Sequence, residues 1–356
     1  RCNKFTLSNY TSYFRKMKNV LITGAGSPGG PGIIKSIHQK YTVHGADADP
    51  KATGKGLCSV FHTIPKASNK NFIQELLAIV ETHHIHVLIP LVTKELELFS
   101  SHILAFEKLN CKVVVNALTS LQICNNKNYL LQKIQAAGLE IPEYIAVNNV
   151  QDLANASKEL NYPEKTICVK PSESNGMRGF RIINSSIDRA ALFWNEKPNN
   201  AHCTMEELRQ ILGVAFREIL VMEYLPGKEY TVDCIAHRGK AKLILPRERL
   251  RMNNGISTRG KFVNHTGIIE YCTRIIELFD LHGPIGVQLK EDANGIPKML
   301  EINPRLQGTT VAAEGLGINI PDISIQQALG NEPELNGGEL DWGKEFGRYY
   351  TEIFWD

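Results

Sequence analysis

The sequence predicts two successive regions, a parallel α/β region followed by a larger α+β region. Near the start, a strand, a glycine-rich turn, a helix and a second strand follow one another between residues 19 and 45, which is the beginning of a parallel α/β unit. From residue 166 onward, short strand-like segments recur and imply a substantial antiparallel or mixed sheet. With 356 residues, 43% of them hydrophobic, the chain can bury more than one core.

The first region is expected to span residues 17–116. Its strands are predicted at 20–22, 41–45, 87–89 and 113–115, and its helices around 33–37 and at 71–82. Residues 1–16 precede the first strand as an extension and are assigned no function. We place the boundary after Asn116, where the last strand of this region closes.

The second region, residues 117–356, opens with a helical pattern over 118–137. Gly138 and Pro142 end this helix, since a glycine followed by a proline is typical of a helix end that leads into extended chain. The strand-like segments that follow lie at 166–170, 180–183, 219–223, 230–236, 242–245, 285–289 and 299–302. No internal repeat or low-complexity tract is present.

Composition argues against several kinds of partner. The net charge is +3 and 22% of the residues are charged, so the bulk charge indicates neither a nucleic acid nor an anionic membrane. No apolar run reaches the roughly 20 residues that span a bilayer, and the start lacks the apolar core of a secretory signal. Eight scattered cysteines without a CxxC pair suit a reducing compartment. We therefore expect a soluble, cytoplasmic protein.

The turn after the first strand leaves alternatives open. Residues 24–29 read Gly-Ala-Gly-Ser-Pro-Gly, and Asp47 and Asp49 follow about 20 residues later, which is the spacing of a dinucleotide-binding fingerprint. However, Pro28 and Pro31 remove amides that could have faced a pyrophosphate. The turn is therefore an NAD site, a tight packing turn, or a loop whose remaining amides help to hold an anionic substrate.

A loop between two strands predicts phosphate binding. Residues 170–179 place a lysine at the end of an apolar strand and continue with small polar residues and glycines, whose backbone amides can approach phosphate oxygens. Lys170 and Arg178 can add positive charge to that contact. A flexible surface hairpin is the alternative, but the position of the lysine favours phosphate.

The segment 221–230 combines a strand, a short turn and two carboxylates. Extended backbone at Tyr224 and Leu225 can meet the edge of an adenine ring, and the carboxylate of Glu229 can accept hydrogen bonds from ribose hydroxyls. An acidic hairpin has the same pattern, so this segment is informative only together with the others.

The strongest local signal is a strand with alternating polar residues. Glu301 and Asn303 lie on one face of it, so their oxygens point the same way, as two ligands of Mg²⁺ should. Gln288, on a predicted neighbouring strand, can add a third oxygen. Arg305 follows, where it can neutralise charge on a phosphoryl group in transfer. A carboxylate and an amide inside an apolar strand need partners, which argues against a merely polar sheet face.

In order and spacing, these motifs and Lys127 resemble the ATP-grasp superfamily, and in particular single-module proteins similar to the large chain of carbamoyl phosphate synthetase. The likeness runs from about Lys18 to the C-terminus. It implies an N-terminal Rossmann-like pre-ATP-grasp domain at 17–116, followed at 117–356 by an ATP-grasp fold whose two α+β subdomains clamp ATP. Residues from about 166 to 225 would form the smaller subdomain, which covers the ATP.

The resemblance also implies roles for individual residues. ATP would be bound by Lys127, Lys170, Ser172, Ser174, Gly176, Arg178, Gly179, Glu223, Tyr224, Leu225 and Glu229. Magnesium, as two ions for which Mn²⁺ can substitute, would be bound by Gln288, Glu301 and Asn303. The glycine-rich turn and a second loop at 90–97 would form the substrate side of the cleft. Many relatives are dimers, so a homodimer is one expectation.

The resemblance predicts an ATP-dependent ligase that joins a small-molecule carboxylate to an amine, or to a thiol. ATP would convert the carboxylate into an acyl phosphate and leave as ADP. Its catalytic residues are expected to be Arg305, Arg247 and Lys170. An NAD-binding oxidoreductase and a catalytically inactive ATP-binding regulator are the alternatives. Synthesis of carbamoyl phosphate by this chain alone is not expected, because it holds one module and no glutamine-hydrolysing cysteine motif.

Arginines near the strand at 242–245 are candidates for binding the substrate. Arg247, Arg249 and Arg259 are expected to face the same cleft, where a guanidinium suits a carboxylate or a terminal phosphate. A solvated basic edge is the alternative. Arg249 and Arg259, together with Gly308 in the segment after Arg305, are predicted to contact substrate.

Overall fold

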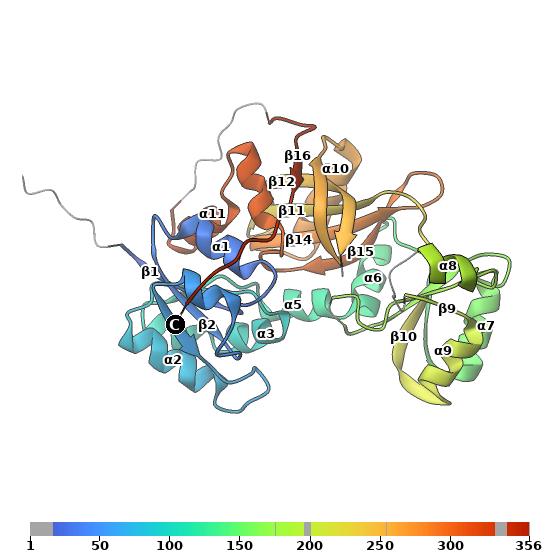
Figure 1. The fold of residues 1–356 in the computed structure, drawn as a ribbon, viewed down its shortest axis with the longest axis horizontal. Helices are drawn as coiled ribbons and strands as arrows, with labels where there is room; N and C mark the ends of the chain where they lie inside the picture. Colours follow the sequence, from blue (N-terminus) through green and yellow to red (C-terminus); the bar gives the residue numbers. More distant parts are fainter. Residues whose placement is uncertain (1–16, 175, 196–200, 254, 332–339, 356) are drawn as a thin grey trace, which may run out of the picture.

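The computed structural model describes residues 17–174, 176–195, 201–253, 255–331 and 340–355, and the predicted extension at 1–16 lies outside these ranges. It contains a parallel sheet near the N-terminus, a small mixed sheet and a large antiparallel sheet (Figure 1). The predicted class, an α/β region followed by an α+β region, is confirmed. No helix of the described residues is long and apolar enough to cross a membrane.

The N-terminal sheet has the strand order β3-β2-β1-β4-β5, and all of its pairs are parallel. Its strands are β1 (Asn19–Thr23), β2 (Thr42–Asp47), β3 (Val60–Thr63), β4 (Val87–Pro90) and β5 (Lys112–Val113). Helices α1 (Gly30–Ile37), α2 (Phe72–Thr82), α3 (Thr93–Ser101) and α4 (Ile103–Lys108) and the 3-10 helix η1 (Thr53–Leu57) accompany it. The central strands are buried and apolar, as is usual where helices cover both faces. The unpredicted β3 is partly exposed, so it lacks that signature.

The predicted single helix at 118–137 is wrong in one respect, because the structure has two helices, α5 (Leu118–Asn125) and α6 (Lys127–Ala136). Asn126 separates them, and its side-chain oxygen accepts a hydrogen bond from the backbone N of Tyr129 at 2.9 Å. Asparagine favours this capping position, which lets a new helix start at the next residue. The break places Lys127 at the first position of α6, where its backbone N donates to the carbonyl of Ser172 at 2.9 Å.

The small sheet has the strand order β6-β10-β7-β8-β9 and lies at the right of Figure 1. Its strands are β6 (Tyr144–Asn149), β7 (Ile167–Pro171), β8 (Arg181–Ile183), β9 (His202–Cys203) and β10 (Ala215–Glu223). Helices α7 (Val150–Glu159), α8 (Arg189–Asn195) and α9 (Met205–Leu212) belong to the same part of the chain. The small sheet has its own buried cluster and begins before residue 166, because β6 is one of its edge strands.

The large sheet has the strand order β15-β14-β11-β12-β13-β16. Its strands are β11 (Glu229–His237), β12 (Lys240–Asn253), β13 (Ile256–Phe262), β14 (Gly283–Glu291), β15 (Pro297–Asn303) and β16 (Glu345–Gly347). Helices α10 (Thr266–Leu278) and α11 (Ile320–Ala328) and the 3-10 helix η2 (Thr310–Leu316) complete this part. The predicted strand at 242–245 lies within the first half of the 14-residue β12.

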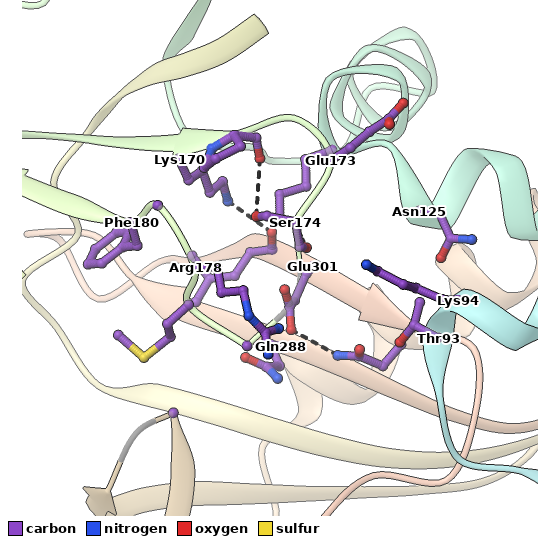
Figure 2. Close-up of a pocket in the computed structure, with 18 of the residues that line it drawn as sticks. Thr93, Lys94, Asn125, Lys170, Glu173, Ser174, Arg178, Phe180, Gln288 and Glu301 are labelled. Atoms are coloured by element: carbon purple, nitrogen blue, oxygen red, sulfur yellow. Dashed lines mark hydrogen bonds between the residues drawn. The ribbon is translucent and has the colours of Figure 1, made fainter. Parts of the chain in front are cut away.

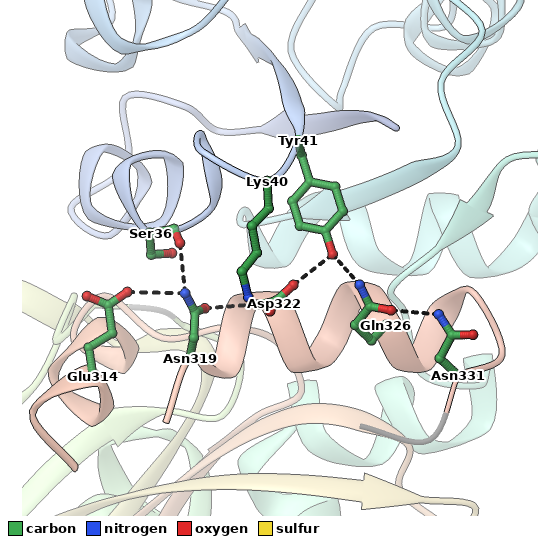
Figure 3. Close-up of polar contacts among 8 residues, drawn as sticks. All are labelled: Ser36, Lys40, Tyr41, Glu314, Asn319, Asp322, Gln326 and Asn331. Carbon is green, nitrogen blue, oxygen red and sulfur yellow. Dashed lines mark hydrogen bonds and ion pairs between the residues drawn. The ribbon is translucent and has the colours of Figure 1, made fainter. Parts of the chain in front are cut away.

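The N-terminal sheet and the large sheet share one buried cluster, which includes Ile22 of β1 and Leu245 of β12. Polar contacts to α11 reinforce it (Figure 3). Asp322 accepts from Lys40 Nζ at 2.5 Å and from the hydroxyl of Tyr41 at 2.7 Å. These two parts therefore meet through a packed core. The small sheet has a core of its own, and its Cys168, Leu220 and Met222 also belong to a buried cluster with the large sheet.

Most cysteines of the described residues lie in the core. Of the seven in the described ranges, six are buried and Cys58 is half-buried, all of them as free thiols. Burial raises the pKa of the Cys124 thiol to about 12, so this thiol is an unreactive packing group at neutral pH.

Candidate active site

A cleft of about 2220 Å³ runs between the three sheets. It is lined by the glycine-rich turn after β1, the loop before α3, the loop after β7, the turn between β10 and β11, and the facing strands β14 and β15. The cleft thus brings together segments more than 270 residues apart in sequence, from Gly24 to Gly308. Figure 2 shows part of its lining.

Two buried lysines lie at the centre of the cleft. Lys127 and Lys170 are 6% and 9% exposed. Lys127 Nζ donates to the carbonyl of Ser174 at 2.6 Å, and Lys170 Nζ donates to the carbonyl of Leu300 at 3.0 Å. Burial, followed by the positive charge of Lys127, lowers the pKa of Lys170 to about 8. The two ammonium groups therefore repel each other in a poorly solvated place, an arrangement that an anion would relieve.

The loop after β7 is tightly folded at its glycines. Gly176 and Gly179 have φ angles of +63° and +78°, and a Cβ on Gly179 would lie 2.6 Å from Cγ of Pro171. Ser174 sits near the start of this loop and lines the cleft. In Figure 2 the side chain of Arg178 extends from the loop toward Gln288. The loop thus brings main chain and a guanidinium to the side of the cleft opposite the large sheet.

Ser172 was predicted to contact ATP, but its side chain points elsewhere. Its Oγ donates to Glu218 Oε1 at 2.6 Å, and Ser172 is only 3% exposed and does not line the cleft. The same Glu218 oxygen accepts from Asn128 Nδ2 at 3.1 Å. Ser172 therefore secures the base of the loop, and its backbone carbonyl meets the amide of Lys127.

The β10–β11 turn borders one end of the cleft. Glu223 Oε1 accepts from the backbone N of Glu143 at 2.9 Å and pairs with Lys298 Nζ at 2.7 Å. The ammonium group of Lys290 lies 5.2 Å from the centre of the Tyr224 ring. Tyr224 and Leu225 both line the cleft. The side chain of Glu223 is thus engaged by protein groups, which leaves main chain and apolar surface of this turn facing the cleft.

Arg249 and Glu229 form an ion pair on the floor of the cleft. Arg249 Nη1 lies 2.5 Å from Glu229 Oε1 and 3.3 Å from Gln288 Oε1. Arg249 Nε donates to Ser257 Oγ at 3.0 Å, and the Arg249 side chain is only 4% exposed. Arg249 therefore holds the side chains of Glu229 and Gln288 in place, and its own side chain exposes little surface to a substrate.

The three predicted oxygen ligands are brought together as expected from the strand pattern. Strands β14 and β15 pair with Gln288 opposite Glu301. Asn303 Nδ2 donates to Glu301 Oε1 at 2.9 Å, so these two side chains share one face of β15. All three line the cleft, where Figure 2 shows Gln288 and Glu301 beside each other. A carboxylate and two amide oxygens form a donor set that Mg²⁺ accepts.

Arg305 connects this oxygen cluster to the N-terminal region. Its Nη2 donates to Asn303 Oδ1 at 3.4 Å, and its Nε donates to the hydroxyl of Thr93 at 3.1 Å. Burial lowers the pKa of its guanidinium, with the charge of Glu301 acting in the opposite direction. The first residue of α3 therefore lies beside the end of β15.

The glycine-rich turn lies at the far end of the same cleft. Gly24, Ser27, Pro28 and Gly29 line it. A Cβ on Gly29 would lie 2.9 Å from Cα of Gly308, so the two backbones are in close contact. Asp47 Oδ2 accepts from the backbone N of Gly26 at 2.8 Å. An acid that would bind a ribose in an NAD site is therefore engaged with the turn itself.

Comparison with known proteins decides the family. Residues 20–114 match a family model described as a PylC-like N-terminal domain, and residues 215–340 match one described as ATP-grasp in the biosynthetic pathway with Ter operon. The chain is an ATP-grasp protein. The predicted order, a Rossmann-like region followed by an ATP-grasp fold, is confirmed.

Curated and solved proteins agree with this ATP-grasp assignment. The large chain of carbamoyl phosphate synthase from Pyrococcus furiosus is 23% identical over 255 residues, which cover 68% of this chain and 21% of that protein. The chain thus spans about a fifth of the length of that relative.

Three solved structures have the same fold. An ADP complex of N5-carboxyaminoimidazole ribonucleotide synthetase has a TM-score of 0.68, with 17% identity over 92% of this chain and 80% of that one. For biotin carboxylase from Campylobacter jejuni the TM-score is 0.66, with 17% identity over 93% and 74%. For L-amino acid ligase from Bacillus licheniformis it is 0.61, with 18% identity over 88% and 74%.

Two of the predicted arginines do not face the ATP-grasp cleft. Arg247 is 1% exposed, and its Nη2 lies 2.6 Å from Asp233 Oδ2. Arg259 pairs with Glu345 Oε2 at 2.6 Å on the surface, where its side chain is 61% exposed. Neither residue lines the cleft. The expectation that both face a substrate there is therefore wrong for this structure, because one is sealed inside the sheet and the other lies on its outer edge.

The sequence predicted that the loop 90–97 borders the cleft, but it did not identify two individual residues of that loop. Glu95 is 6% exposed, lines the cleft and accepts a hydrogen bond from Thr23 Oγ1 at 2.5 Å. Lys94 also lines the cleft. A signal was present, because Lys94 and Glu95 lie four and five residues after the end of an apolar strand, at the carboxyl edge of a parallel sheet.

Proposed function

We propose that this ATP-grasp protein is a ligase that activates a small-molecule carboxylate as an acyl phosphate with MgATP and then joins it to an amine or a thiol. The observation that carries the proposal is the convergence of the oxygen cluster of Glu301, Asn303 and Gln288 with the buried cations Lys170 and Lys127 in one cleft. Oxygen ligands facing cations are suited to a metal-bound triphosphate.

The oxygen cluster fits magnesium. Glu301 supplies one carboxylate, and Gln288 and Asn303 supply amide oxygens on the same face of adjacent strands. When bound there, Mg²⁺ would neutralise phosphate charge and hold the transferring group in line. Two ions, for which Mn²⁺ can substitute, are proposed from the resemblance to the ATP-grasp superfamily.

The protein's own cations complete the charge balance. Lys127 and Lys170 would each approach phosphate oxygens, which relieves their mutual repulsion. Arg305, oriented by Thr93 and Asn303, would face the oxygens of the phosphoryl group as it moves to the carboxylate. The carboxylate itself is the nucleophile, so no protein nucleophile is required.

The loop 172–179 would cover the phosphates during the reaction. Its glycines Gly176 and Gly179 line the cleft, and Arg178 reaches toward Gln288 (Figure 2). Closure over the site would exclude water, which otherwise hydrolyses an acyl phosphate. The names of proteins with this fold, an amino acid ligase and a synthetase among them, support ligase chemistry. The retained lysines and oxygen cluster argue against a catalytically inactive regulator.

The experiment is a thermal melt with Mg²⁺ and a non-hydrolysable ATP analogue, with NAD in a parallel arm. A ligand at 100 times its dissociation constant adds about 2.7 kcal/mol of stability. We expect the wild type and the control variant Glu164→Ala, which changes an exposed residue of the small-sheet region, to be stabilised only when Mg²⁺ and the analogue are both present. Glu301→Ala should lose that stabilisation.

Release of ADP from ATP with pooled carboxylates and amines then tests turnover. We expect release by the wild type and Glu164→Ala only when both pools are supplied. Stabilisation by NAD alone would contradict the proposal. So would a Glu301→Ala protein that is still stabilised by Mg²⁺ and the analogue.

A further inference from the structure

Three strand ends converge at the substrate end of the cleft. Strand β1 lies between β2 and β4 in the parallel sheet, with Thr23 opposite Ala46 on one side and Pro90 on the other. Because the carboxyl ends of parallel strands meet at one edge, Thr23, Asp47 and the start of α3 come together there. The side chain of Glu95 projects from that start of α3 and lines the cleft.

Glu95 is a buried carboxyl group with one oxygen left unpartnered. It is 6% exposed, and only its Oε2 has a hydrogen-bond partner among the described residues, the hydroxyl of Thr23 at 2.5 Å. Oε1 has no hydrogen-bond partner in the described part of the chain but is not fully buried, so it remains accessible from the cleft. A largely buried acceptor without a hydrogen bond costs free energy, which indicates that a ligand donates a hydrogen bond to Oε1.

The surroundings of Glu95 favour a cation. Asp47 also lines the cleft, and its charge acts on Glu95. Within the described ranges, no Lys, Arg or His forms an ion pair with Asp47 or Glu95. Two neighbouring carboxylates without a protein counter-ion have an unfavourable charge that a bound cation would offset.

This corner also adjoins the reaction centre. Thr93, two residues before Glu95, accepts a hydrogen bond from Arg305 Nε at 3.1 Å. Arg305 in turn contacts Asn303 of the oxygen cluster. A group held by Glu95 would therefore lie near the Thr93 side of Arg305 and not beside the oxygen cluster. The acceptor that attacks the acyl phosphate could enter there.

We propose that Glu95, assisted by Asp47, binds the ammonium group of the acceptor substrate and takes a proton from it. This inference rests on the proposed ligase function and narrows it, since the acceptor is then an amine that arrives as a cation and not a thiol. Thr23 holds the carboxyl group in place through Oε2, which leaves Oε1 to meet the ammonium.

The proton and electron balance is complete. The R–NH₃⁺ group gives one proton to the Glu95 carboxylate and becomes R–NH₂. The nitrogen lone pair attacks the carbonyl carbon of the acyl phosphate, a C–N bond forms, and the C–O bond to phosphorus breaks. Phosphate leaves with that electron pair and accepts the second nitrogen proton, which yields an amide and inorganic phosphate. Glu95 then releases its proton to the solvent of the cleft.

The acidity of Glu95 suits this role. Burial raises the pKa of its carboxyl group to about 7, the hydrogen bond from Thr23 opposes the shift, and Asp47 adds to it. A general base functions best when its pKa lies near the working pH. A carboxyl group with an ordinary pKa would be a weaker proton acceptor at neutral pH.

The first arm of the test needs no turnover. Binding of n-propylammonium to the protein loaded with MgADP is measured by saturation-transfer NMR, with propionamide as the uncharged probe. We expect Glu95→Gln to weaken propylammonium binding at least tenfold, and Glu75→Gln to leave it unchanged. Glu75 is a matched control because it lies exposed in the first turn of α2, in the same region. Equal binding by wild type and Glu95→Gln would overturn the proposal.

The second arm separates this inference from the ligase proposal. Hydroxylamine is largely uncharged at neutral pH and traps acyl phosphates as hydroxamates without first losing a proton. With pooled carboxylates, Glu95→Gln should form hydroxamate at the wild-type rate, while amide formation with pooled amines falls at least tenfold. Loss of both products together would place Glu95 outside the amine step. A wild type that makes no hydroxamate contradicts the ligase proposal, and the NMR arm still decides the ammonium site.

The pH profile of activity is a third readout, and it distinguishes loss of the general base from misfolding of the variant. The wild-type kcat/KM for amine should rise with pH through a midpoint near neutrality, and Glu95→Gln should lose that limb. Thr23→Val keeps the carboxyl group but removes the hydrogen bond that lowers its pKa, so its midpoint should move to higher pH. Glu95→Asp should restore part of the limb. A Thr23→Val profile identical to that of the wild type would contradict the assignment.

Discussion

Arg247 and Asp233 form an ion pair 2.6 Å long, with side chains only 1% and 3% exposed. Arg247 Nη1 also donates to Thr309 Oγ1 at 3.0 Å, and Asp233 Oδ1 accepts from Thr310 Oγ1 at 2.9 Å. The ring of Phe346 lies 5.5 Å from the guanidinium carbon. The pair therefore braces, from inside the large sheet, the segment that carries Gly308 to the cleft.

Arg247→Ala is predicted to reduce stability strongly. It would leave the Asp233 carboxylate buried without its counter-ion, a change that typically costs about 3–5 kcal/mol. Urea unfolding measures the difference. Arg251→Ala, on the exposed end of the same strand, should change the free energy of unfolding by about 0.5 kcal/mol or less. A loss below about 1 kcal/mol in Arg247→Ala would mean that the pair contributes little.

The fate of Arg247 shows where sequence reasoning reaches its limit. Arg247 and Arg249 are two positions apart on β12 and share a face, so their sequence context is nearly the same. Arg249 nevertheless borders the cleft, whereas Arg247 is sealed by Phe346 of β16, about a hundred residues later in the chain. No local pattern carries that information, because the burial depends on a distant edge strand.

Features set by local periodicity were predicted well. Alternation within β15 was enough to place Glu301 and Asn303 on one face, and the apolar runs predicted the central strands of the N-terminal sheet and the large sheet. The break at Asn126 was missed, because the apolar pattern continues across it and only the capping side chain reveals it. Glu95 was missed as a site residue because its role depends on contact with Thr23 and Asp47.

The affinity for ATP is predicted to fall above pH 8. The pKa of Lys170 is lowered to about 8, mainly by burial, so the ammonium form is present below this pH and is lost above it. Because the charged form binds phosphate, the dissociation constant for a non-hydrolysable ATP analogue should be nearly flat from pH 7 to 8 and then rise by up to about tenfold per pH unit.

Calorimetric titration of the analogue between pH 7 and 9.5 measures this dependence. Lys170→Arg keeps the charge at every pH and should flatten the profile. Lys165→Arg, an exposed change just before β7, should keep the wild-type dependence. An unchanged slope in Lys170→Arg would assign the titration to another group.

The stability of the ligand-free protein is predicted to depend on pH through the ionisation of Glu95. Its folded pKa of about 7 lies above the unfolded value of 4.5, so the folded state binds the proton more tightly. This group therefore reduces stability progressively as the pH rises from 4.5 to 7, by about 3 kcal/mol in total. His44, whose pKa burial lowers to about 4, acts in the opposite direction below pH 6.5.

The two effects overlap, so the difference between wild type and Glu95→Gln is the quantity to measure. Urea unfolding at pH 4.5 and pH 8 should show that the variant gains stability relative to the wild type at the higher pH. Glu75→Gln should show no such gain, since its side chain is exposed. A constant difference across this range would contradict the raised pKa.

Gly29→Ala is predicted to impair the substrate end of the cleft while leaving ATP binding intact. The new methyl group would lie 2.9 Å from Cα of Gly308 and 3.1 Å from the carbonyl oxygen of Gln307, and a backbone contact this short forces one of the two loops to move. The buried network around Asp233 holds the 307–310 segment in place, so the glycine-rich turn is the part that should shift. We expect amide formation to fall at least tenfold, because a displacement of about 1 Å costs about a hundredfold in a well-oriented reaction.

Gly347→Ala is the matched control, since nothing lies within 4 Å of its added methyl group. Stabilisation by the ATP analogue should be the same in both variants, and a Gly29→Ala enzyme with normal turnover would show that this contact does not shape the substrate site.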